Sequence, residues 1–475
     1  MCDKRVEQKT QWFVDGKYGV MMHFLGSIHE SDESWNARVN AFDCEGLAKQ
    51  LHACGASHLL FTISQTGGRF CCPIASYDAV LKEGGIEKKL CSERDLIADL
   101  IRALKPYGIN LLLYAAAEGP IAGELGNLFP WDSTGIGPGE GFTQRYFAML
   151  QELSERYGSD VRGWWIDGCY AHYRGYFDSN DTPFLRDMSK ALRAGNPDSI
   201  LAYNSGIEVK KLYVDQDYTC GEADQLIFYP TERMIDGAQW HVLTYLGPWW
   251  SDRMSARSNL ELVPYAKTCI ERGGVLTFDV GYDEHGHIAA EHAAQLQVIR
   301  RFLKDGECGE IPESEDYLNN MATVAMDEIC DDDYVNIALG KDCTASSSYS
   351  DTMPGDFFPE KAVDGDANTG WAPGFVAKNG VWWQVDLGAS ERIDAIEMLT
   401  RNGNNCERRN FEIRASDDPE FSTYTVLYHQ GEFPLPRPLH WVKKLDGAAY
   451  RYVRLQVNGR FCIPFISEMR VLQKK

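Results

Sequence analysis

The sequence lacks the features of several large classes of protein. No stretch approaches 18 uninterrupted apolar residues, and the first residues include no apolar core of a signal peptide, so no membrane span is expected. As given, the chain is predicted to be cytoplasmic, or secreted if a leader has been trimmed from it. Basic residues are scarce. Against 69 Asp and Glu there are 47 Lys and Arg, and the net charge of −22 argues against nucleic acid as a partner.

Several short chemical motifs are absent as well. The sequence has no Gly-rich phosphate loop, no Gly-x-Ser-x-Gly elbow and no His-x-x-x-His pair, so no nucleotide, serine nucleophile or catalytic metal is expected. The 14 cysteines are scattered without metal-ligand spacing, and only Cys71 and Cys72 are neighbours. We interpret them as mostly reduced thiols.

What is present indicates a globular α/β protein of two domains. With 475 residues, the chain is too long for one ordinary core. Eight short apolar runs alternate with helical patterns, which predicts a (β/α)8 TIM-like barrel over residues 1–310. A doubly wound open sheet is the alternative, but no Gly-x-Gly-x-x-Gly turn follows an early strand. The runs are Tyr18–Phe24, Ser57–Ser64, Ile109–Ala116, Arg162–Gly168, Ser199–Gly206, Asp217–Glu222, Ala238–Leu246 and Gly273–Gly281. The clearest helical patterns are Cys44–Ala53, Glu93–Leu104, Phe142–Tyr157, Pro183–Ala194 and Ala289–Leu303.

The pattern changes after the barrel. Residues 311–334 are rich in acidic side chains and are predicted to form a solvated connector, with an ordered extension packed on the barrel as the alternative. Residues 335–475 show short alternating strands separated by Gly, Pro, Asn and Asp, which predicts a β-sandwich.

Motifs along this second domain make its resemblance specific. They are Asn336–Lys341, Thr344–Ser348, Lys361–Asp366, Thr369–Trp371, Trp382–Gly388 and Tyr452–Leu455. The domain resembles the discoidin or coagulation factor 5/8 type C fold, a galactose-binding-like jelly roll that includes many carbohydrate-binding modules. Trp382 and Trp383 lie in a strand motif and are predicted to be core residues. The candidates for sugar contacts lie in or near loops and are Arg401, Asn402, Asn404, Phe433 and His440.

The same resemblance implies a structural calcium ion. Asp364, Asp366 and Thr369 offer hard oxygen ligands from one tight turn, which suits calcium. Glu468 matches the position of a distant carboxylate ligand in this fold. A plain Asx-rich turn is the alternative interpretation.

Polar residues that end the apolar runs of the barrel are the candidates for its active site. Active sites of such barrels lie at the C-terminal ends of the strands, where His23, Asp167, Glu222 and Asp279 are expected. A carboxylate that closes an apolar strand is costly to bury without a task, although a structural ion pair would also explain Asp167. Two facing carboxylates are what glycoside hydrolysis needs.

Aromatic side chains agree with a sugar pocket, because flat rings stack on the CH faces of pyranoses. About half of them are expected to belong to the core instead. The tryptophans near predicted strand ends are Trp35, Trp164, Trp165, Trp240, Trp249 and Trp250.

The barrel as a whole resembles the retaining α-L-fucosidases of glycoside hydrolase family 29. The resemblance implies that Asp167 is the nucleophile and Glu222 the acid/base, with Glu208 and Glu232 as alternatives for the second role. The expected substrate-binding residues are His23, Trp35, Gln65, Thr66, Arg69, Tyr114, Trp240 and Asp279. The matching segments are Trp12–Phe13, Lys17–Val20, His23, Cys54–Ala56, Tyr114, Glu152–Leu153, Arg156–Gly158, Trp165–Gly168, Asp217–Thr219, Glu222, Gly273–Gly281 and Asp283–Ile288.

The sequence departs from that family at several places, most clearly after the second strand. Where the fucosidases carry Lys-His-His-Asp-Gly-Phe after the second strand, this chain has Ser64–Phe70, and both sugar-binding histidines are missing. We therefore expect an exo-glycosidase that removes a terminal α-linked fucose or a configurationally related sugar from a glycan. The alternatives are a different sugar, such as an anionic one paired with Arg69, and a non-catalytic glycan-binding protein. The sequence does not indicate an oligomeric state.

Overall fold

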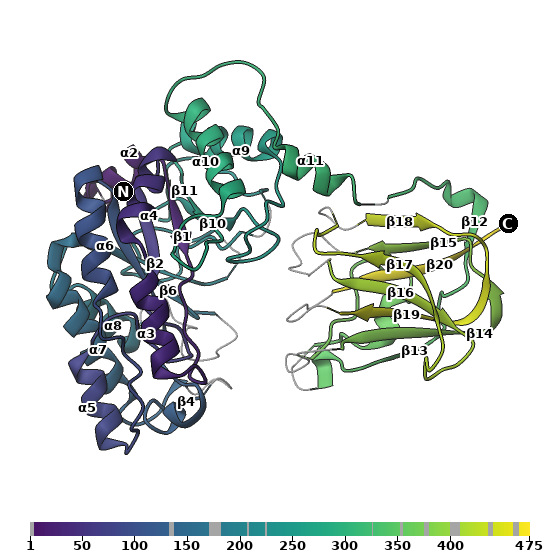
Figure 1. Ribbon diagram of the computed structural model, residues 1–475, viewed down its shortest axis with the longest axis horizontal. Coiled ribbons are helices and arrows are strands. Elements are labelled where there is room, and N and C mark those ends of the chain that lie inside the picture. The colour runs from purple at the N-terminus through teal and green to yellow at the C-terminus, as the bar shows by residue number, and fades with distance from the viewer. Residues whose placement is uncertain are drawn as a thin grey trace. The chain divides into compact units, whose positions relative to one another are not determined.

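The computed structural model divides the chain into two compact units, Met1–Ser314 and Glu315–Lys475 (Figure 1). The structure describes residues 4–475 except 133–136, 171–181, 207–208, 224–225, 325, 352–354, 375–379, 400–408, 436–439 and 459–464. We call the first unit the barrel and the second unit the module.

The barrel is built on a parallel sheet of seven strands, in the order β10-β11-β1-β2-β3-β6-β7. The predicted (β/α)8 architecture is therefore confirmed. These strands are β1 (Tyr18–Met22), β2 (His58–Thr62), β3 (Asn110–Ala116), β6 (Val161–Asp167), β7 (Ile200–Tyr203), β10 (His241–Tyr245) and β11 (Val275–Asp279). Four further short strands lie outside this sheet: β4 (Trp131–Asp132), β5 (Gly137–Pro138), β8 (Met234–Ile235) and β9 (Ala238–Gln239).

The sixth predicted run lies between β7 and β10 and joins the two edges of the sheet. The amide of Asp217 donates to the carbonyl of Leu201, and the sequence then pairs in parallel with the opposite edge through Tyr218 with Gln239 and Glu222 with Leu243. Because these contacts are isolated bridges, this segment is not a regular strand. It nevertheless places Glu222 at the same end of the barrel as the last residue of β6.

Helices follow the strands, as the apolar periodicity predicts. Residues 44–53 and 142–157 form helices with the predicted bounds, and the Asp43 side chain caps the first of them by accepting from the amide of Gly46. The helices of the barrel are α1 (Lys4–Lys9), α2 (Gln11–Gly16), α3 (Asp32–Ala41), α4 (Cys44–Ala53), α5 (Ala75–Glu83), α6 (Leu96–Leu104), α7 (Phe142–Tyr157), α8 (Pro183–Leu192), α9 (Asn259–Glu271) and α10 (Ala290–Leu303).

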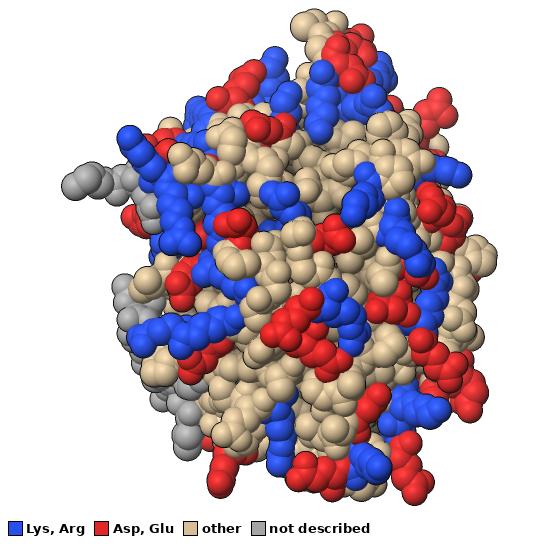
Figure 2. All heavy atoms as spheres, turned by 90° about the vertical axis from the view of Figure 1, so that its left-hand side faces the viewer, with Lys and Arg blue, Asp and Glu red and all other residues tan. Residues whose placement is uncertain are grey.

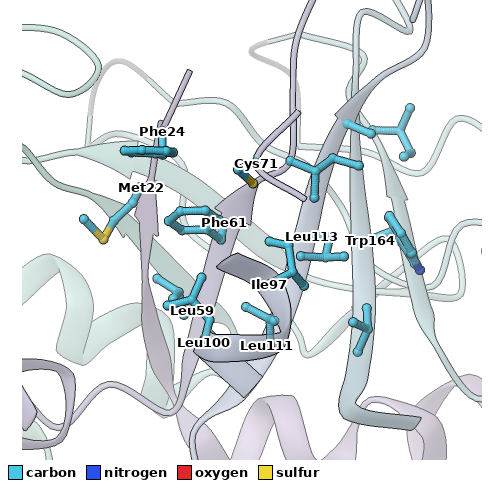
Figure 3. Close-up of a cluster of buried hydrophobic side chains, with 14 of the residues drawn as sticks. Met22, Phe24, Leu59, Phe61, Cys71, Ile97, Leu100, Leu111, Leu113 and Trp164 are labelled. Atoms are coloured by element: carbon cyan, nitrogen blue, oxygen red, sulfur yellow. The ribbon is translucent and has the colours of Figure 1, made fainter. Parts of the chain in front are cut away.

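The main core of the barrel lies between the sheet and its outer helices. In Figure 3, Leu59 and Phe61 of β2 and Leu111 and Leu113 of β3 lie near Ile97 and Leu100 of α6. All six side chains are at most 2% exposed. Each Å² of apolar surface buried here stabilises the packing of sheet against helices by about 25 cal/mol. This packing fixes the strands of the sheet in place.

The module is a sandwich of two antiparallel sheets, as the discoidin-like pattern predicts. One sheet has the order β12-β20-β15-β18 and the other β13-β14-β19-β16-β17. Trp371, Trp383 and Trp441 are at most 1% exposed between them, so Trp383 is a core residue, while Trp382 is only partly buried. The strands are β12 (Tyr334–Asn336), β13 (Asp342–Ala345), β14 (Trp382–Arg392), β15 (Ala395–Leu399), β16 (Phe411–Ser416), β17 (Thr425–Gln430), β18 (His440–Lys444), β19 (Ala449–Val457) and β20 (Glu468–Lys474).

The predicted acidic connector, residues 311–334, is divided between the two units. Glu313 belongs to the barrel, where its carboxylate accepts from the amide of Asn259. A short helix, α11 (Glu315–Met321), begins the module, and Asp327 bonds to β18 through the amide of Lys444. Much of this stretch is therefore held by contacts rather than fully solvated.

Surface charge and cysteine state can be followed on the described part of the chain. On the face in Figure 2, acidic and basic side chains are interspersed, so neither sign forms a continuous surface there. Every cysteine in the described ranges is free, and most are buried. Among these residues, no helix is both long enough and apolar enough to cross a membrane.

Candidate active site

The candidate site lies where the parallel strands of the barrel end. Asp167 is the last residue of β6, Asp279 is the last residue of β11, and His23 follows β1 by one residue. Asn204 follows the last residue of β7, and its backbone amide donates to the carbonyl of Ile166 on the neighbouring strand (2.7 Å). Glu222 ends the segment Asp217–Glu222, which bridges the two edge strands of the sheet, β7 and β10. Parallel strands thus bring these polar residues to one rim, as barrel geometry requires.

A cavity of about 280 Å³ opens at this rim. Its walls combine carboxylates, one imidazole, one amide and several aromatic rings, which is the mixture expected of a small polar ligand site. The lining residues are His23, Leu25, Gln65, Tyr114, Trp165, Asp167, Glu222, Leu243, Trp249, Trp250 and Ser251.

Neutral donors surround the carboxylate of Asp167. Its Oδ1 accepts from the amide of Gly168 (2.8 Å), the hydroxyl of Tyr170 (2.9 Å) and Nδ2 of Asn204 (2.8 Å). Its Oδ2 accepts from the hydroxyl of Tyr114 (2.6 Å). Burial and the charge of Asp167 raise the pKa of Tyr114 well above its usual value, so this hydroxyl keeps its proton and donates. Four neutral donors therefore surround this half-buried carboxylate.

Glu222 shares one of these donors. Nδ2 of Asn204 also donates to Oε2 of Glu222 (2.9 Å). Because the same nitrogen is 2.8 Å from Oδ1 of Asp167 and 2.9 Å from Oε2, these two oxygens lie no more than 5.7 Å apart. Two carboxyl groups therefore face one cavity at short range.

His23 and Asp279 form a histidine–aspartate pair at the rim. Nδ1 of His23 lies 2.6 Å from Oδ1 of Asp279, whose Oδ2 accepts from the amide of Ser251 (2.6 Å). Burial lowers the pKa of His23, but the adjacent Asp279 outweighs it, with smaller contributions from Asp167 and Glu222, so the net pKa is raised. With both oxygens engaged, Asp279 orients His23 toward the cavity and does not itself line it.

Aromatic rings make up much of the remaining wall. Tyr114 and Trp165 stack at 5.3 Å with an interplanar angle of 17°, and Trp250 meets the ring of His23 edge-on at 5.6 Å. Gln65 donates to the hydroxyl of Tyr114 (2.8 Å), so its amide lies against the same wall. Such a wall can contact the apolar face of a sugar.

Besides Asp279, four predicted substrate-binding residues do not line the cavity. Trp35 is fully buried and donates through Nε1 to the carbonyl of Phe70, and Trp240 is packed over Gly274. Arg69 is 1% exposed, and its guanidinium is occupied by the carbonyls of Ser27, Glu30 and Lys89 and by the carboxylate of Asp32. Thr66 is only partly buried, but its side chain does not line the cavity.

Sequence reasoning missed several residues at the site. Asn204 lies near the end of the fifth apolar run and directly follows β7, so the rule that found Asp167 also applies to it. Tyr170 and Ser251 lie in loops and do not end an apolar run, so no sequence pattern indicated them. Glu118 lies two residues beyond β3, and its Oε2 is buried with no hydrogen-bond partner among the described residues. Burial, followed by the charge of Asp167, raises the pKa of Glu118 to about 7. Of the alternative acids, Glu232 is exposed and does not line the cavity, and Glu208 lies outside the described residues.

In the module, the predicted ligand residues of the turn lie close together. The hydroxyl of Thr369 lies 2.9 Å from both carboxylate oxygens of Asp364, and the amide of Asp366 donates to Asp364 (3.0 Å). Oε2 of Glu468 is buried with no hydrogen-bond partner in the described chain. Burial raises the pKa of Glu468 to about 7, and Asp364 and Asp366 add to this effect. The described residues include no group of three or more His, Cys, Asp or Glu side chains arranged to hold a metal.

The predicted sugar contacts of the module are less well placed. Phe433 is 5% exposed and packs edge-on against Tyr317 at 6.1 Å. Nε2 of His440 contacts the buried carboxylate of Glu397 (2.7 Å). Arg401, Asn402 and Asn404 lie outside the described residues.

Comparison with protein families identifies both units. The model of the alpha-L-fucosidase family matches residues 27–307, more than half of the chain, and the F5/8 type C domain model matches residues 342–469. The chain belongs to the alpha-L-fucosidase family. This family assignment confirms the resemblance of the barrel, and the second match confirms that of the module.

Several solved structures match this chain at low sequence identity. A putative alpha-L-fucosidase from Bacteroides thetaiotaomicron is 16% identical, with coverage of 98% of this chain and 97% of the other and a TM-score of 0.46. A Ruminococcus gnavus GH29 fucosidase, solved in complex with fucose, is 14% identical over 98% and 94%, with a TM-score of 0.45. No curated protein matches this family member in sequence.

Proposed function

We propose that the protein is a retaining exo-glycosidase that removes a terminal α-linked L-fucose, or a sugar of related configuration, from a glycan. The observation that carries this proposal is the pair of carboxylates, Asp167 and Glu222, which face one cavity and share the amide of Asn204. Their nearest oxygens lie within 5.7 Å, which accommodates the separation of about 5 to 5.5 Å between carboxyl groups in retaining enzymes. The family assignment supports the same chemistry.

The proposed mechanism has two displacements. Asp167 attacks the anomeric carbon and forms a covalent glycosyl-enzyme while Glu222 protonates the departing oxygen. Glu222 then takes a proton from water, which attacks the same carbon and releases the sugar with its configuration retained. The His23–Asp279 pair and Gln65 offer polar groups for sugar hydroxyls, and the wall of Trp165, Trp249 and Trp250 offers apolar contact.

A neutral sugar fits the pocket better than an anionic one. The guanidinium of Arg69, the group that suggested an acidic or sulfated substrate, is buried and fully engaged by Asp32 and three carbonyls. Gln65 faces the cavity in the segment where the fucosidases carry histidines, and this supports a changed preference among neutral sugars. The ordered donors around Asp167 favour an enzyme over a non-catalytic glycan-binding barrel.

One experiment tests sugar, nucleophile and stereochemistry together. A panel of aryl α- and β-glycosides should identify one sugar that is hydrolysed, and NMR of the first product should show retention of configuration. The matching 2-deoxy-2-fluoro glycosyl fluoride should label Asp167, as found by mass spectrometry of peptides. Labelling of another carboxylate would exclude the assigned nucleophile, and no turnover of any glycoside would favour the non-catalytic alternative.

We also propose that the module holds a structural calcium ion at Asp364, Asp366, Thr369 and Glu468. The orphaned, buried Oε2 of Glu468 beside acidic neighbours supports this, because a cation would satisfy it. The described side chains alone do not complete a metal site, so main-chain carbonyls of the turn would have to contribute. The ion would stabilise the turn and takes no part in hydrolysis.

A further inference from the structure

Asn204 occupies a central place between the two carboxylates of the site. It follows β7, the fifth barrel strand, whereas Asp167 ends the fourth strand and Glu222 ends the sixth segment. Its side chain is fully buried. One amide hydrogen can be assigned to Oδ1 of Asp167 and the other to Oε2 of Glu222, at 2.8 and 2.9 Å from Nδ2. Each donor of this amide therefore serves one of the proposed catalytic groups.

The orientation of this amide is fixed by the backbone. Oδ1 of Asn204 accepts from the amide of Gly206 (2.9 Å). A flipped side chain would direct its NH₂ at that N–H group and its oxygen at two carboxylates, which is unfavourable at both ends. The NH₂ group therefore points permanently at Asp167 and Glu222, and it costs no reorganisation when substrate binds.

The hydrogen bonds also distinguish the two oxygens of Asp167. Oδ1 accepts from three donors, which use up its lone pairs, whereas Oδ2 accepts only from Tyr114 among the described residues. At Glu222, the donor on Oε2 favours a proton on the other oxygen, because a protonated oxygen is a poor acceptor. One amide thus biases the chemistry of both groups.

We propose that Asn204 is a positioning residue that sets the separation of Asp167 and Glu222 and leaves Oδ2 of Asp167 as the attacking atom. This inference rests on the proposed function. Oδ2 forms a bond to the anomeric carbon as the glycosidic carbon–oxygen bond breaks, and the electron pair of that bond leaves on the aglycone oxygen. That oxygen takes the proton of Glu222, so the step balances with no other reactant.

Asn204→Ser tests this role, because it removes both donors and stays neutral. We expect kcat on the best aryl glycoside to fall by about a hundredfold or more, the effect of a misplaced catalytic group. The acidic limb of the pH profile should move to higher pH, since fewer donors then stabilise the carboxylates. The titratable groups around this amide and the two carboxylates are Asp167, Glu222, Tyr114, Tyr170, His23, Glu118, Cys169 and Cys220.

A matched control exists at the opposite end of β6. Asn196 is also buried, and its Nδ2 donates to the carbonyl of Val161 (2.9 Å), the first residue of that strand. Asn196→Ser should lower the melting temperature without moving the pH profile. Asn204→Asp keeps the volume of the side chain, and its activity relative to wild type should rise as pH falls, because the introduced carboxyl group can donate again once it is protonated. Wild-type-like kcat and pH profiles in both Asn204 variants would overturn the proposal.

Crystal structures give a readout that does not depend on turnover. In Asn204→Ser, the distance between Oδ1 of Asp167 and Oε2 of Glu222 should be longer than in the wild type, where it is at most 5.7 Å. An unchanged distance would overturn the positioning role even if no substrate is found. In a trapped wild-type adduct, the ester should run through Oδ2, with Oδ1 still bonded to Asn204, and an ester through Oδ1 would contradict the assignment. A wild type that hydrolyses no glycoside would instead reject the proposed function alone.

Discussion

The barrel and the module each bury a glutamate beside other carboxylates, and the two glutamates differ in what surrounds them. Glu118 lies against Asp167 in the barrel, and Glu468 lies near Asp364 and Asp366 in the module. In both glutamates Oε2 is buried without a partner in the described chain, and burial beside like charges raises the pKa to about 7. The neighbouring charges, however, are stabilised in different ways.

Around Asp167, the charge is met by neutral donors from Tyr114, Gly168, Tyr170 and Asn204. Around Asp364, the contacts come from the hydroxyl of Thr369 and the amide of Asp366 within the same turn. Clustered carboxylates can be stabilised by hydrogen-bond donors or by a cation, and only stabilisation by a cation responds to a chelator. We therefore expect the barrel to be indifferent to calcium and the module to depend on it.

The largest expected effect comes from removing the charge that the barrel donors surround. Asp167→Asn should keep the fold but lower kcat by at least about a thousandfold, because an amide cannot form the glycosyl-enzyme. Steady-state kinetics on the best aryl glycoside measures this loss. Asp160→Asn, at the other end of β6 in an exposed pair with Lys105, is the control and should retain activity. Activity of Asp167→Asn within tenfold of wild type would remove it from the nucleophile role.

The two buried glutamates should have the next largest effect, on stability against pH. Their folded pKa of about 7 lies above the usual 4.5, so the folded state binds these protons more tightly than the unfolded state. Their contribution is complete below about pH 4.5 and is lost as pH rises toward about 7. Glu118→Gln should remove about 1 to 3 kcal/mol of this pH dependence from the barrel.

Denaturant unfolding of the whole chain at about pH 4.5 and about pH 7.5 measures this difference. The comparison between the units becomes sharper with Glu468→Gln, which should flatten the pH dependence of the module in chelator and also weaken its stabilisation by calcium, because it removes a proposed charged ligand. A Glu118→Gln protein whose stability varies with pH as steeply as wild type would show that this carboxyl is not the proton-binding group.

Calcium itself provides the third test. An ion that binds only the folded module stabilises it by about 2.7 kcal/mol at a hundredfold excess over its dissociation constant. Scanning calorimetry of the whole chain should therefore show that chelator lowers the melting transition of the module and leaves that of the barrel unmoved. Asp364→Ala should abolish the difference between calcium and chelator, since loss of a charged ligand weakens the site. Identical melting in both conditions would show that the turn at Asp364 binds no calcium.

Much of the fold followed from the sequence because periodicity reports it directly. The bounds of α4 and α7 and the positions of seven of the eight predicted barrel strands follow from apolar spacing. The same reasoning could not say which way a side chain points. Trp35 lies on the buried face of α3, and Arg69 turns inward to bond backbone carbonyls, although both lie near strand ends in the sequence.

The site was predicted best where a polar residue closes an apolar strand. His23, Asp167 and Glu222 reach the cavity for this reason, and Asp279 reaches the layer behind it. Asn204 has a similar position at the end of its strand but carries no charge, so the sequence does not distinguish it from an ordinary polar residue at a strand end. Glu118 could not be found from sequence, because its special environment depends on the space beside Gly168, where a Cβ atom would lie 2.1 Å from its Oε2.

The smallest expected effect comes from removing one donor and leaving the others. Tyr114→Phe deletes the hydroxyl that contacts Oδ2 of Asp167 at 2.6 Å, while the three donors to Oδ1 remain. One charge-assisted hydrogen bond contributes about 1.5 to 3 kcal/mol, so kcat/KM should fall by roughly ten- to a hundredfold. The acidic limb of the pH profile should move to higher pH, because the ionised form of the carboxyl loses one of its stabilising contacts.

Tyr146→Phe is the matched control for this variant. Its hydroxyl donates to the carbonyl of Ala116 (2.6 Å), close to the same strand end, without contact to Asp167. It should lower stability and leave the pH profile in place. If Tyr114→Phe behaved like this control, a neutral donor at Oδ2 would not be what stabilises the charge of Asp167. Another group would then have to stabilise the charge of Asp167. If added cations changed the activity of the barrel, the barrel and the module would no longer differ in how they stabilise their carboxylates.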